Sequence, residues 1–238
     1  MELFIDTANL EQIKEAVSWG VITGATTNPK IFSCEKEIGD LKEKVLEIFE
    51  IGNFPLSLET TSEDHLGMVE EAKEYASWHE NIVIKIPMGI EGLKAVNILE
   101  RKEMIKTNVT AIMATNQAIL ASLAGASYAS LFYGRIADSG YDPLFVIKDV
   151  SQLFKAENLK TKLIVGSIRN MLDITKAFLA GADIVTVPFD FLKKMATNLK
   201  TEETIREFNN IWKEMREKGQ VRVKTKPTAP NRLTLVRK

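Results

Sequence analysis

Several features that mark other classes of protein are missing from this 238-residue chain. Its single cysteine, Cys34, excludes an intrachain disulfide and is typical of proteins from reducing compartments. The two histidines, His65 and His79, form no cluster with it that has zinc-ligand spacing. No apolar run approaches the roughly 20 residues of a membrane-crossing helix, and the N-terminal segment does not resemble a signal peptide. We therefore expect a cytoplasmic protein with no metal site and no membrane partner.

A large excess of charge of either sign is missing as well. With 31 basic and 32 acidic residues the net charge is −1, so no overall field attracts nucleic acid or a membrane surface. The segment 220–238 is the exception, because it holds six basic residues and no acidic one. Its prolines, Pro227 and Pro230, argue against a continuous helix. We interpret it as an extended or artificial tail; the alternatives are a basic arm that binds an acidic neighbouring subunit and, with less support, nucleic-acid binding.

What the sequence does contain is an alternation of short apolar runs and helical patterns. The runs predict eight strands, at residues 3–7, 24–29, 55–60, 82–87, 106–112, 128–133, 162–167 and 184–189. Eight βα units predict an α/β fold, a (β/α)8 TIM barrel that forms a single domain over residues 1–219. This domain includes a last helix with Ile205, Phe208 and Trp212 on one face. The alternative, an open doubly wound sheet, lacks its G-x-G-x-x-G turn.

Local signals mark several helix ends. The sequence Leu-Ala-Gly-Ala occurs at 123–126 and again at 179–182, and glycine just beyond a helix adopts the left-handed conformation at low cost. Such repetition is typical of similar βα units. One helix is expected over 35–51, and Ser62 and Thr201 are expected to cap two others.

One predicted strand, Ile-Val-Ile-Lys-Ile-Pro at 82–87, places a lysine among β-branched residues. Such a run is typical of a strand buried on both faces of a parallel sheet. A buried ammonium must be paired or must lose its proton. Lys85 is therefore either a structural ion pair, which the strand by itself favours, or an amine for nucleophilic chemistry.

Polar residues stand at or near the ends of other predicted strands too. They are Asp6, Asn28, Glu59, Thr110, Ser130, Ser167 and Arg169. Each alone is compatible with a helix cap or a turn, but buried polar groups each need a partner, so structure alone does not explain the set. The active site of a (β/α)8 barrel lies at the carboxyl ends of its strands. The set therefore predicts a catalytic rim around Lys85.

The residue types on this rim indicate covalent catalysis by an amine. Lys85 can add to a ketone, and the resulting iminium draws electrons from a neighbouring C–C bond. Asp6 and Glu59 are the candidates for the proton transfers. Arg135 and Arg169 are candidates for binding a phosphate, although each alone is also compatible with a solvated surface arginine.

A series of segments resembles the transaldolase family, in its short-chain branch, which also contains fructose-6-phosphate aldolases. They are Phe-Ile-Asp-Thr-Ala-Asn (4–9), Thr-Thr-Asn-Pro (26–29), Ile-Lys-Ile-Pro (84–87) with Glu-Gly-Leu (91–93), Asn-Val-Thr (108–110), Gly-Arg-Ile (134–136) and Gly-Ser-Ile-Arg-Asn (166–170). The resemblance extends from residue 1 to about residue 218 and leaves the tail unmatched.

Position by position, the resemblance implies a role for each rim residue. Lys85 matches the Schiff-base lysine, and Asp6 the group that takes the C4 hydroxyl proton during C–C cleavage. Glu59 and Thr110 match the pair that holds the water used in forming and hydrolysing the imine. The other positions are implied to bind substrate: Asn28, Asn108 and Ser130 the dihydroxyacetone unit, and Arg135, Ser167 and Arg169 the phosphate.

Two positions separate the sister activities. The aldolase branch carries glutamine at the position of Glu59 and tyrosine at that of Phe132, so this chain resembles the transaldolases at both. A phenol beside the enamine would offer a proton or a water site and release free dihydroxyacetone, whereas Phe132 offers neither. Tyr133 is expected to point to the other face of its strand.

These expectations combine into one predicted activity. The resemblance implies a transaldolase, a transferase of carbohydrate metabolism in the pentose phosphate pathway, which converts sedoheptulose 7-phosphate and glyceraldehyde 3-phosphate into erythrose 4-phosphate and fructose 6-phosphate. It implies no cofactor, since the protonated imine is the electron sink, and a homo-oligomer, a pentamer or a decamer. The alternatives are a fructose-6-phosphate aldolase and a catalytically silent barrel that binds sugar phosphates.

Overall fold

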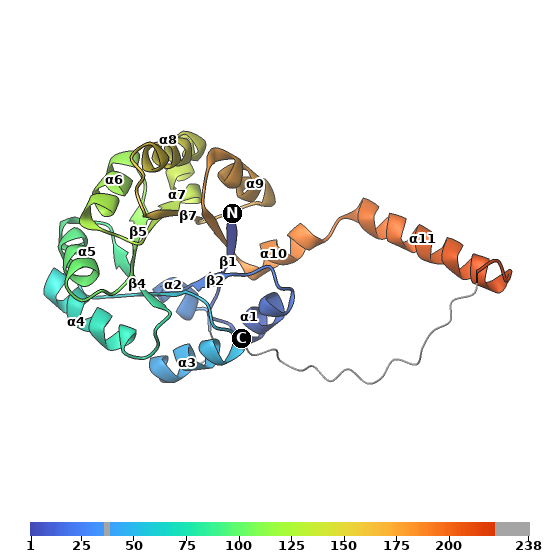
Figure 1. Cartoon of the computed structure of the whole chain (residues 1–238), viewed down its shortest axis with the longest axis horizontal. Helices are drawn as coiled ribbons and strands as arrows, with labels where there is room; N and C mark the ends of the chain where they lie inside the picture. The colour runs from blue at the N-terminus through green and yellow to red at the C-terminus, as the bar shows by residue number, and fades with distance from the viewer. Residues whose placement is uncertain (36–38, 222–238) are drawn as a thin grey trace. The chain divides into compact units, whose positions relative to one another are not determined.

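The chain folds into a closed barrel of eight parallel strands with helices outside it, as its sequence predicts (Figure 1). The computed structural model describes residues 1–35 and 39–221. Each strand pairs with the next in the sequence, and β8 pairs with β1 to close the ring. The strands are β1 (Glu2–Asp6), β2 (Gly24–Thr26), β3 (Leu56–Glu59), β4 (Ile82–Pro87), β5 (Thr107–Ile112), β6 (Tyr128–Phe132), β7 (Lys162–Gly166) and β8 (Ile184–Val187).

The helices follow the strands, with additional short ones after β2 and β6. They are α1 (Leu10–Ser18), α2 (Pro29–Phe32), α3 (Leu41–Ile51), α4 (His65–Ala76), α5 (Ile90–Arg101), α6 (Thr115–Ala124), α7 (Tyr133–Asp138), α8 (Pro143–Ala156), α9 (Met171–Ala180), α10 (Phe189–Ala196) and α11 (Leu199–Glu217). The short helices α2 and α7 were not expected from the sequence. Both begin at the carboxyl end of a strand, so they carry side chains to the rim of the barrel.

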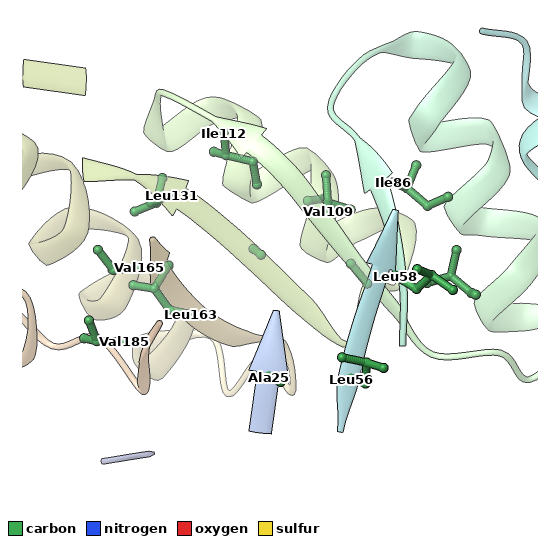
Figure 2. Close-up of a cluster of buried hydrophobic side chains, with 14 of the residues drawn as sticks. Ala25, Leu56, Leu58, Ile86, Val109, Ile112, Leu131, Leu163, Val165 and Val185 are labelled. Atoms are coloured by element: carbon green, nitrogen blue, oxygen red, sulfur yellow. The ribbon is translucent and has the colours of Figure 1, made fainter. Parts of the chain in front are cut away.

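Alternation along each strand separates an apolar outer face from a mixed inner one. Outward residues such as Ile84 and Ile86 belong to the main hydrophobic cluster, which also contains helix residues. Figure 2 shows part of this cluster, with Ile86 labelled. Lys85 lies between Ile84 and Ile86 and therefore faces the interior. The same alternation turns Ser57, Asn108 and Ser130 inward, where all three are buried. The sequence thus builds the core outside the ring of strands and keeps polar groups inside it.

An apolar layer fills the amino-terminal end of the barrel interior. Phe4, Ile164 and Ile184 form this layer and are almost fully buried. A Cβ atom on Gly24 would lie 2.4 Å from the Phe4 ring, so glycine at this position leaves room for that ring. The inward residues that follow on the same strands are Asp6, Gly166 and Thr186, and all three line the open space at the carboxyl end.

Some predicted helix ends are confirmed and others are wrong. Gly125 and Gly181 end their helices with φ of 104° and 109°, in the predicted left-handed conformation. Asp64, not Ser62, caps α4, because its carboxylate accepts two backbone N–H bonds at once. The helix expected over 35–51 begins at Leu41, and residues 36–38 lie outside the described part.

The chain divides into two compact units, Met1–Met195 and Ala196–Lys238. The first contains the barrel. In the second, Asn198 caps α11 in place of the predicted Thr201, since its Oδ1 accepts from two backbone N–H groups. The predicted tail 220–238 lies outside the described residues except for its first two. Within the described ranges, no helix is both long and apolar enough to cross a membrane.

Candidate active site

A cavity of about 310 Å³ lies at the carboxyl end of the barrel. Most of the predicted site residues line it: Asp6, Asn28, Lys85, Ser130, Phe132, Arg135 and Ser167. The barrel therefore brings together predicted residues from five of the strands and their following loops. Other lining residues were not predicted: Thr26, Lys30, Ile31, Cys34, Gly166, Thr186 and Pro188.

Lys85 stands at the centre of this arrangement. Its side chain is 4% exposed, and Nζ lies 3.0 Å from Glu59 Oε2 and donates a hydrogen bond to the Thr27 carbonyl at 3.1 Å. The ion pair follows from the register, because Glu59 and Lys85 are neighbours across β3 and β4. The Phe132 ring lies with its centroid 5.9 Å from the same nitrogen. The ammonium is thus paired, yet its residue lines the cavity.

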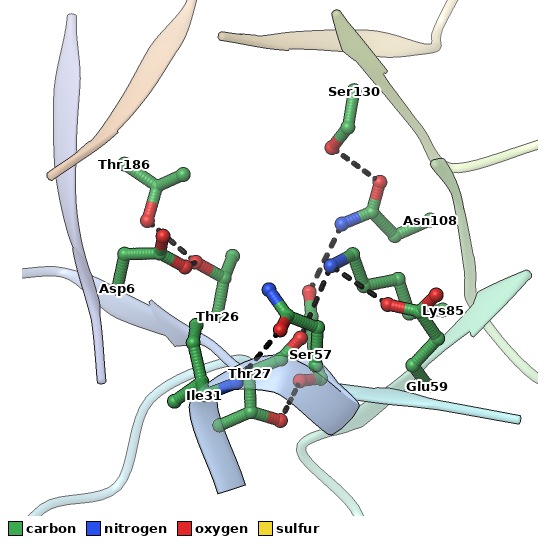
Figure 3. A network of polar contacts seen from close by, with 11 residues as sticks. Asp6, Thr26, Thr27, Ile31, Ser57, Glu59, Lys85, Asn108, Ser130 and Thr186 are labelled. Atoms are coloured by element: carbon green, nitrogen blue, oxygen red, sulfur yellow. Dashed lines mark hydrogen bonds and ion pairs between the residues drawn. The ribbon is translucent and has the colours of Figure 1, made fainter. Parts of the chain in front are cut away.

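Asp6 occupies the opposite side of the polar interior (Figure 3). Thr26 Oγ1 donates to Asp6 Oδ1 at 2.6 Å, and the Thr186 hydroxyl lies 2.5 Å from that of Thr26. Burial raises the pKa of the Asp6 carboxyl above its ordinary value, and the nearby charge of Glu59 adds to this. The Thr26 hydrogen bond and the charge of Lys85 act in the other direction without cancelling the shift. A carboxylate with a raised pKa is a stronger base.

A hydrogen-bonded row connects three strands beside Lys85. Asn108 Nδ2 donates to Ser57 Oγ at 3.1 Å, and Ser130 Oγ donates to Asn108 Oδ1 at 2.7 Å. Asn108 is fully buried and neighbours Lys85 in the β4–β5 register. The row fixes the orientation of this amide. Asn28 has a similar constraint, because its Oδ1 accepts from the Ile31 N–H and starts α2.

Two buried hydroxyls stand out in the part of the chain that the structure describes, because they have no hydrogen-bond partner. They are Thr60 Oγ1 and Thr110 Oγ1. Thr110 faces the interior by alternation with Asn108, and the next residue, Ala111, has a φ of 57° where the β5–β6 register shifts. A buried hydroxyl without a partner loses the free energy of a hydrogen bond, so a water or substrate oxygen is needed to satisfy it.

The three residues predicted to bind phosphate do not all meet. Arg135 and Ser167 line the cavity, and Ser167 has a φ of 58°, while its carbonyl accepts from the Gly134 N–H at 3.0 Å. Arg169 is not among the lining residues. It forms a bidentate ion pair with Asp138 of α7 and holds the pKa of that carboxyl below its ordinary range.

Phe132 and Tyr133 lie as the alternation predicts. Phe132 ends β6 and lines the cavity, whereas Tyr133 begins α7 and packs in the main hydrophobic cluster. The site residues that the sequence argument missed carry weaker signals. Thr26 lies in a matched segment and Thr186 is inward by alternation on β8, but Lys30 is marked only by its charge.

Comparisons with known proteins extend these observations to the whole chain. A family model described as Transaldolase/Fructose-6-phosphate aldolase matches residues 3–233. A probable transaldolase of Caldicellulosiruptor saccharolyticus is 48% identical over 220 residues, which cover 92% of this chain and 100% of that protein. Probable transaldolases of Carboxydothermus hydrogenoformans (46% over 216 residues, 91% and 100% covered) and Methanococcus maripaludis (47% over 212 residues, 89% and 97% covered) are similar to it as well.

Among solved structures, a mutant flavocytochrome b2 with benzoylformate shares the fold, with a TM-score of 0.55 at 15% identity. The match covers 79% of this chain and 56% of that chain, and it concerns architecture alone. Sequence identity of almost one residue in two along nearly the whole chain is much stronger evidence of relationship than this shared architecture. The chain belongs to the Transaldolase/Fructose-6-phosphate aldolase family.

Proposed function

We propose that this transaldolase-type enzyme transfers a dihydroxyacetone unit between sugar phosphates through an imine on Lys85. The observation that carries the proposal is the position of Lys85, a buried residue that lines the cavity, with its amine 3.0 Å from Glu59. A lysine that served only as a structural ion pair would gain nothing from lining a cavity. The donors would be ketose phosphates such as sedoheptulose 7-phosphate or fructose 6-phosphate.

Imine formation requires the ammonium to lose a proton. Glu59 is the base within reach, and the uncharged amine then attacks C2 of the ketose. The carbonyl oxygen takes up a proton and leaves as water from the carbinolamine. The unpartnered hydroxyl of Thr110 supports a site for this water.

Carbon–carbon cleavage follows from the electron demand of the protonated imine. Asp6 takes the C4 hydroxyl proton, the C3–C4 bond breaks, and its electron pair enters the enamine as the aldose phosphate leaves. The enamine carbon then attacks the aldehyde of a second aldose phosphate, and Asp6 returns its proton to the new alkoxide. Water finally hydrolyses the imine and restores the Lys85 amine.

A Thr110→Val variant tests the water site. Valine removes the unpartnered hydroxyl at nearly constant shape, so we expect unfolding stability to change by less than about 1 kcal/mol while imine formation slows about 10- to 100-fold. The matched control is Thr60→Val, which removes the other unpartnered hydroxyl and is expected to leave the rate unchanged. Thermal unfolding and the rate of borohydride-trapped imine are the measurements; equal rates in both variants would refute a role for Thr110.

The first alternative activity is that of a fructose-6-phosphate aldolase. The proposal disfavours it because Phe132 stands where that branch carries tyrosine. Transfer to erythrose 4-phosphate and release of free dihydroxyacetone without an acceptor are measured side by side. We expect transfer to dominate in the wild-type protein. Dominant release of dihydroxyacetone would make the chain a lyase.

A Phe132→Tyr variant should move the protein toward that rival. The added hydroxyl lies on a ring whose centroid is 5.9 Å from Lys85 Nζ, where it can supply a proton or hold a water for the enamine. We expect the ratio of release to transfer to rise about tenfold, a shift of roughly 1.4 kcal/mol in relative barriers. An unchanged ratio would show that Phe132 does not determine the fate of the enamine.

A silent barrel that only binds sugar phosphates is the second rival, and it predicts no covalent adduct. We further propose that the enzyme acts in the cytoplasm, in the pentose phosphate pathway, as a homo-oligomer. Support for assembly comes from α11, where Ile205, Phe208 and Trp212 are exposed at helical spacing. Mass measurement of the full chain in solution tests this.

A further inference from the structure

We propose that Lys30 is a specificity-determining residue that binds the terminal phosphate of the substrate together with Arg135. This inference rests on the proposed function, because it assigns the group that recognises the phosphorylated end of the same substrate. Lys30 follows β2 in the short helix α2 and lines the cavity that contains Lys85.

The charged residues that line the cavity favour the binding of an anion. Three cationic residues, Lys30, Lys85 and Arg135, line it, but Asp6 is the one carboxylate among the lining residues. Lys85 is already paired with Glu59. Among the residues that the structure describes, neither Lys30 nor Arg135 makes a hydrogen bond or an ion pair through its charged group, although the charge of Arg135 contributes to the lowered pKa of Asp138. A phosphate monoester carries about two negative charges near neutral pH and matches the two remaining cations.

The barrel sets these two cations across the mouth from each other. Lys30 follows β2 and Arg135 follows β6, and four strand positions separate β2 and β6 in a ring of eight. Lys85 comes from β4, midway between them. A ketose whose C2 is bound to Lys85 therefore lies in a cavity that Lys30 and Arg135 both line.

Arg169 is engaged elsewhere. Both terminal nitrogens of its guanidinium donate to the Asp138 carboxylate, and its stem crosses Gly134, where a Cβ atom would lie 2.5 Å from Nε. A phosphate would have to replace Asp138 as its partner. Lys30 has no such competitor among the described residues, so it is the more available second cation.

The backbone at Lys30 is held by hydrogen bonds, whereas the residue itself is exposed. Asn28 caps α2 one residue before Pro29, and the Lys30 carbonyl accepts hydrogen bonds from the side chains of Ser33 and Cys34. The flexible four-carbon side chain lets the ammonium reach phosphates that lie at different distances from Lys85. This suits an enzyme whose donors differ by one carbon in length.

A Lys30→Gln variant of the full chain tests the assignment. We expect its KM for fructose 6-phosphate and its dissociation constant for inorganic phosphate to rise about tenfold. The kcat and the KM for unphosphorylated fructose should change less than about twofold. The salt dependence of kcat/KM should become weaker, because one cation is lost.

Two further variants serve as controls. Lys30→Arg keeps the charge and should retain most of the phosphate affinity, and Lys148→Gln removes an exposed lysine of α8 and should change nothing. Unchanged phosphate affinity in Lys30→Gln, or an equal loss in Lys148→Gln, would overturn the inference. The proposed function and this inference can fail separately. If the wild-type protein forms no imine but the Lys30→Gln variant still binds phosphate more weakly than the wild type, the proposed function is refuted and this inference stands.

Discussion

A Lys85→Met variant is expected to lose transfer activity by on the order of 10⁴-fold or more, because the reaction then has no nucleophile. Lys30 is the other primary amine that lines the cavity, but it is exposed and lies in helix α2, after a different strand. It should not replace Lys85. Steady-state transfer from fructose 6-phosphate to erythrose 4-phosphate is the measurement. Activity within tenfold of the wild type would contradict the account.

The same substitution has a stability effect that needs a control. Without Lys85, the carboxylate of Glu59 stays 17% exposed and loses its partner, so we expect a cost of about 2 kcal/mol. A Lys85→Met/Glu59→Gln variant removes both charges and should recover most of that cost. Thermal unfolding of the two variants therefore separates loss of chemistry from loss of folding, because both should be folded at assay temperature and both inactive.

An Asp6→Asn variant is expected to lower kcat by about 10²- to 10⁴-fold while leaving imine formation intact. Asparagine keeps an oxygen that can accept from Thr26 but does not take the C4 hydroxyl proton. Borohydride should therefore trap the whole ketose phosphate on this variant instead of the three-carbon unit. Trapping of the three-carbon unit at the wild-type rate would show that another base performs the cleavage.

Asp6 should also make stability depend on pH in a definite direction. Its pKa in the folded protein is raised above the ordinary value of 3.8, so ionisation costs folding free energy as the pH rises from about 3.8 through the folded pKa. Below both values the carboxyl is protonated in both states and the cost vanishes. We expect Asp6→Asn to be more stable than the wild type at pH 7 and equally stable near pH 3. The reverse order at pH 7 would mean that Asp6 is stabilised as an anion.

The fold was largely predictable because each strand carries its own signal. The run around Lys85 matched β4 at both ends, and the eight strands close in sequence order. Helix ends were less predictable, since capping depends on which of several nearby acceptors reaches the free N–H groups. Asp64 and Asn198 each satisfy two such groups and therefore replace the weaker candidates Ser62 and Thr201.

The candidate site was predictable where alternation and strand ends fix a side chain. Asp6, Lys85 and Phe132 line the cavity for that reason. The partners of long side chains were not predictable, because they depend on loops. Arg169 reaches Asp138 across Gly134. The position of Lys30 is set by the short helix α2, which no helical periodicity in the sequence predicts.

Borohydride reduction of the full chain with fructose 6-phosphate, followed by intact mass measurement, tests the central claim most directly. Reduction converts an imine into a stable secondary amine. The account predicts one added dihydroxyacetone-derived group on each wild-type chain and none on Lys85→Met. No added mass on the wild-type protein, or an addition that persists in Lys85→Met, would contradict it.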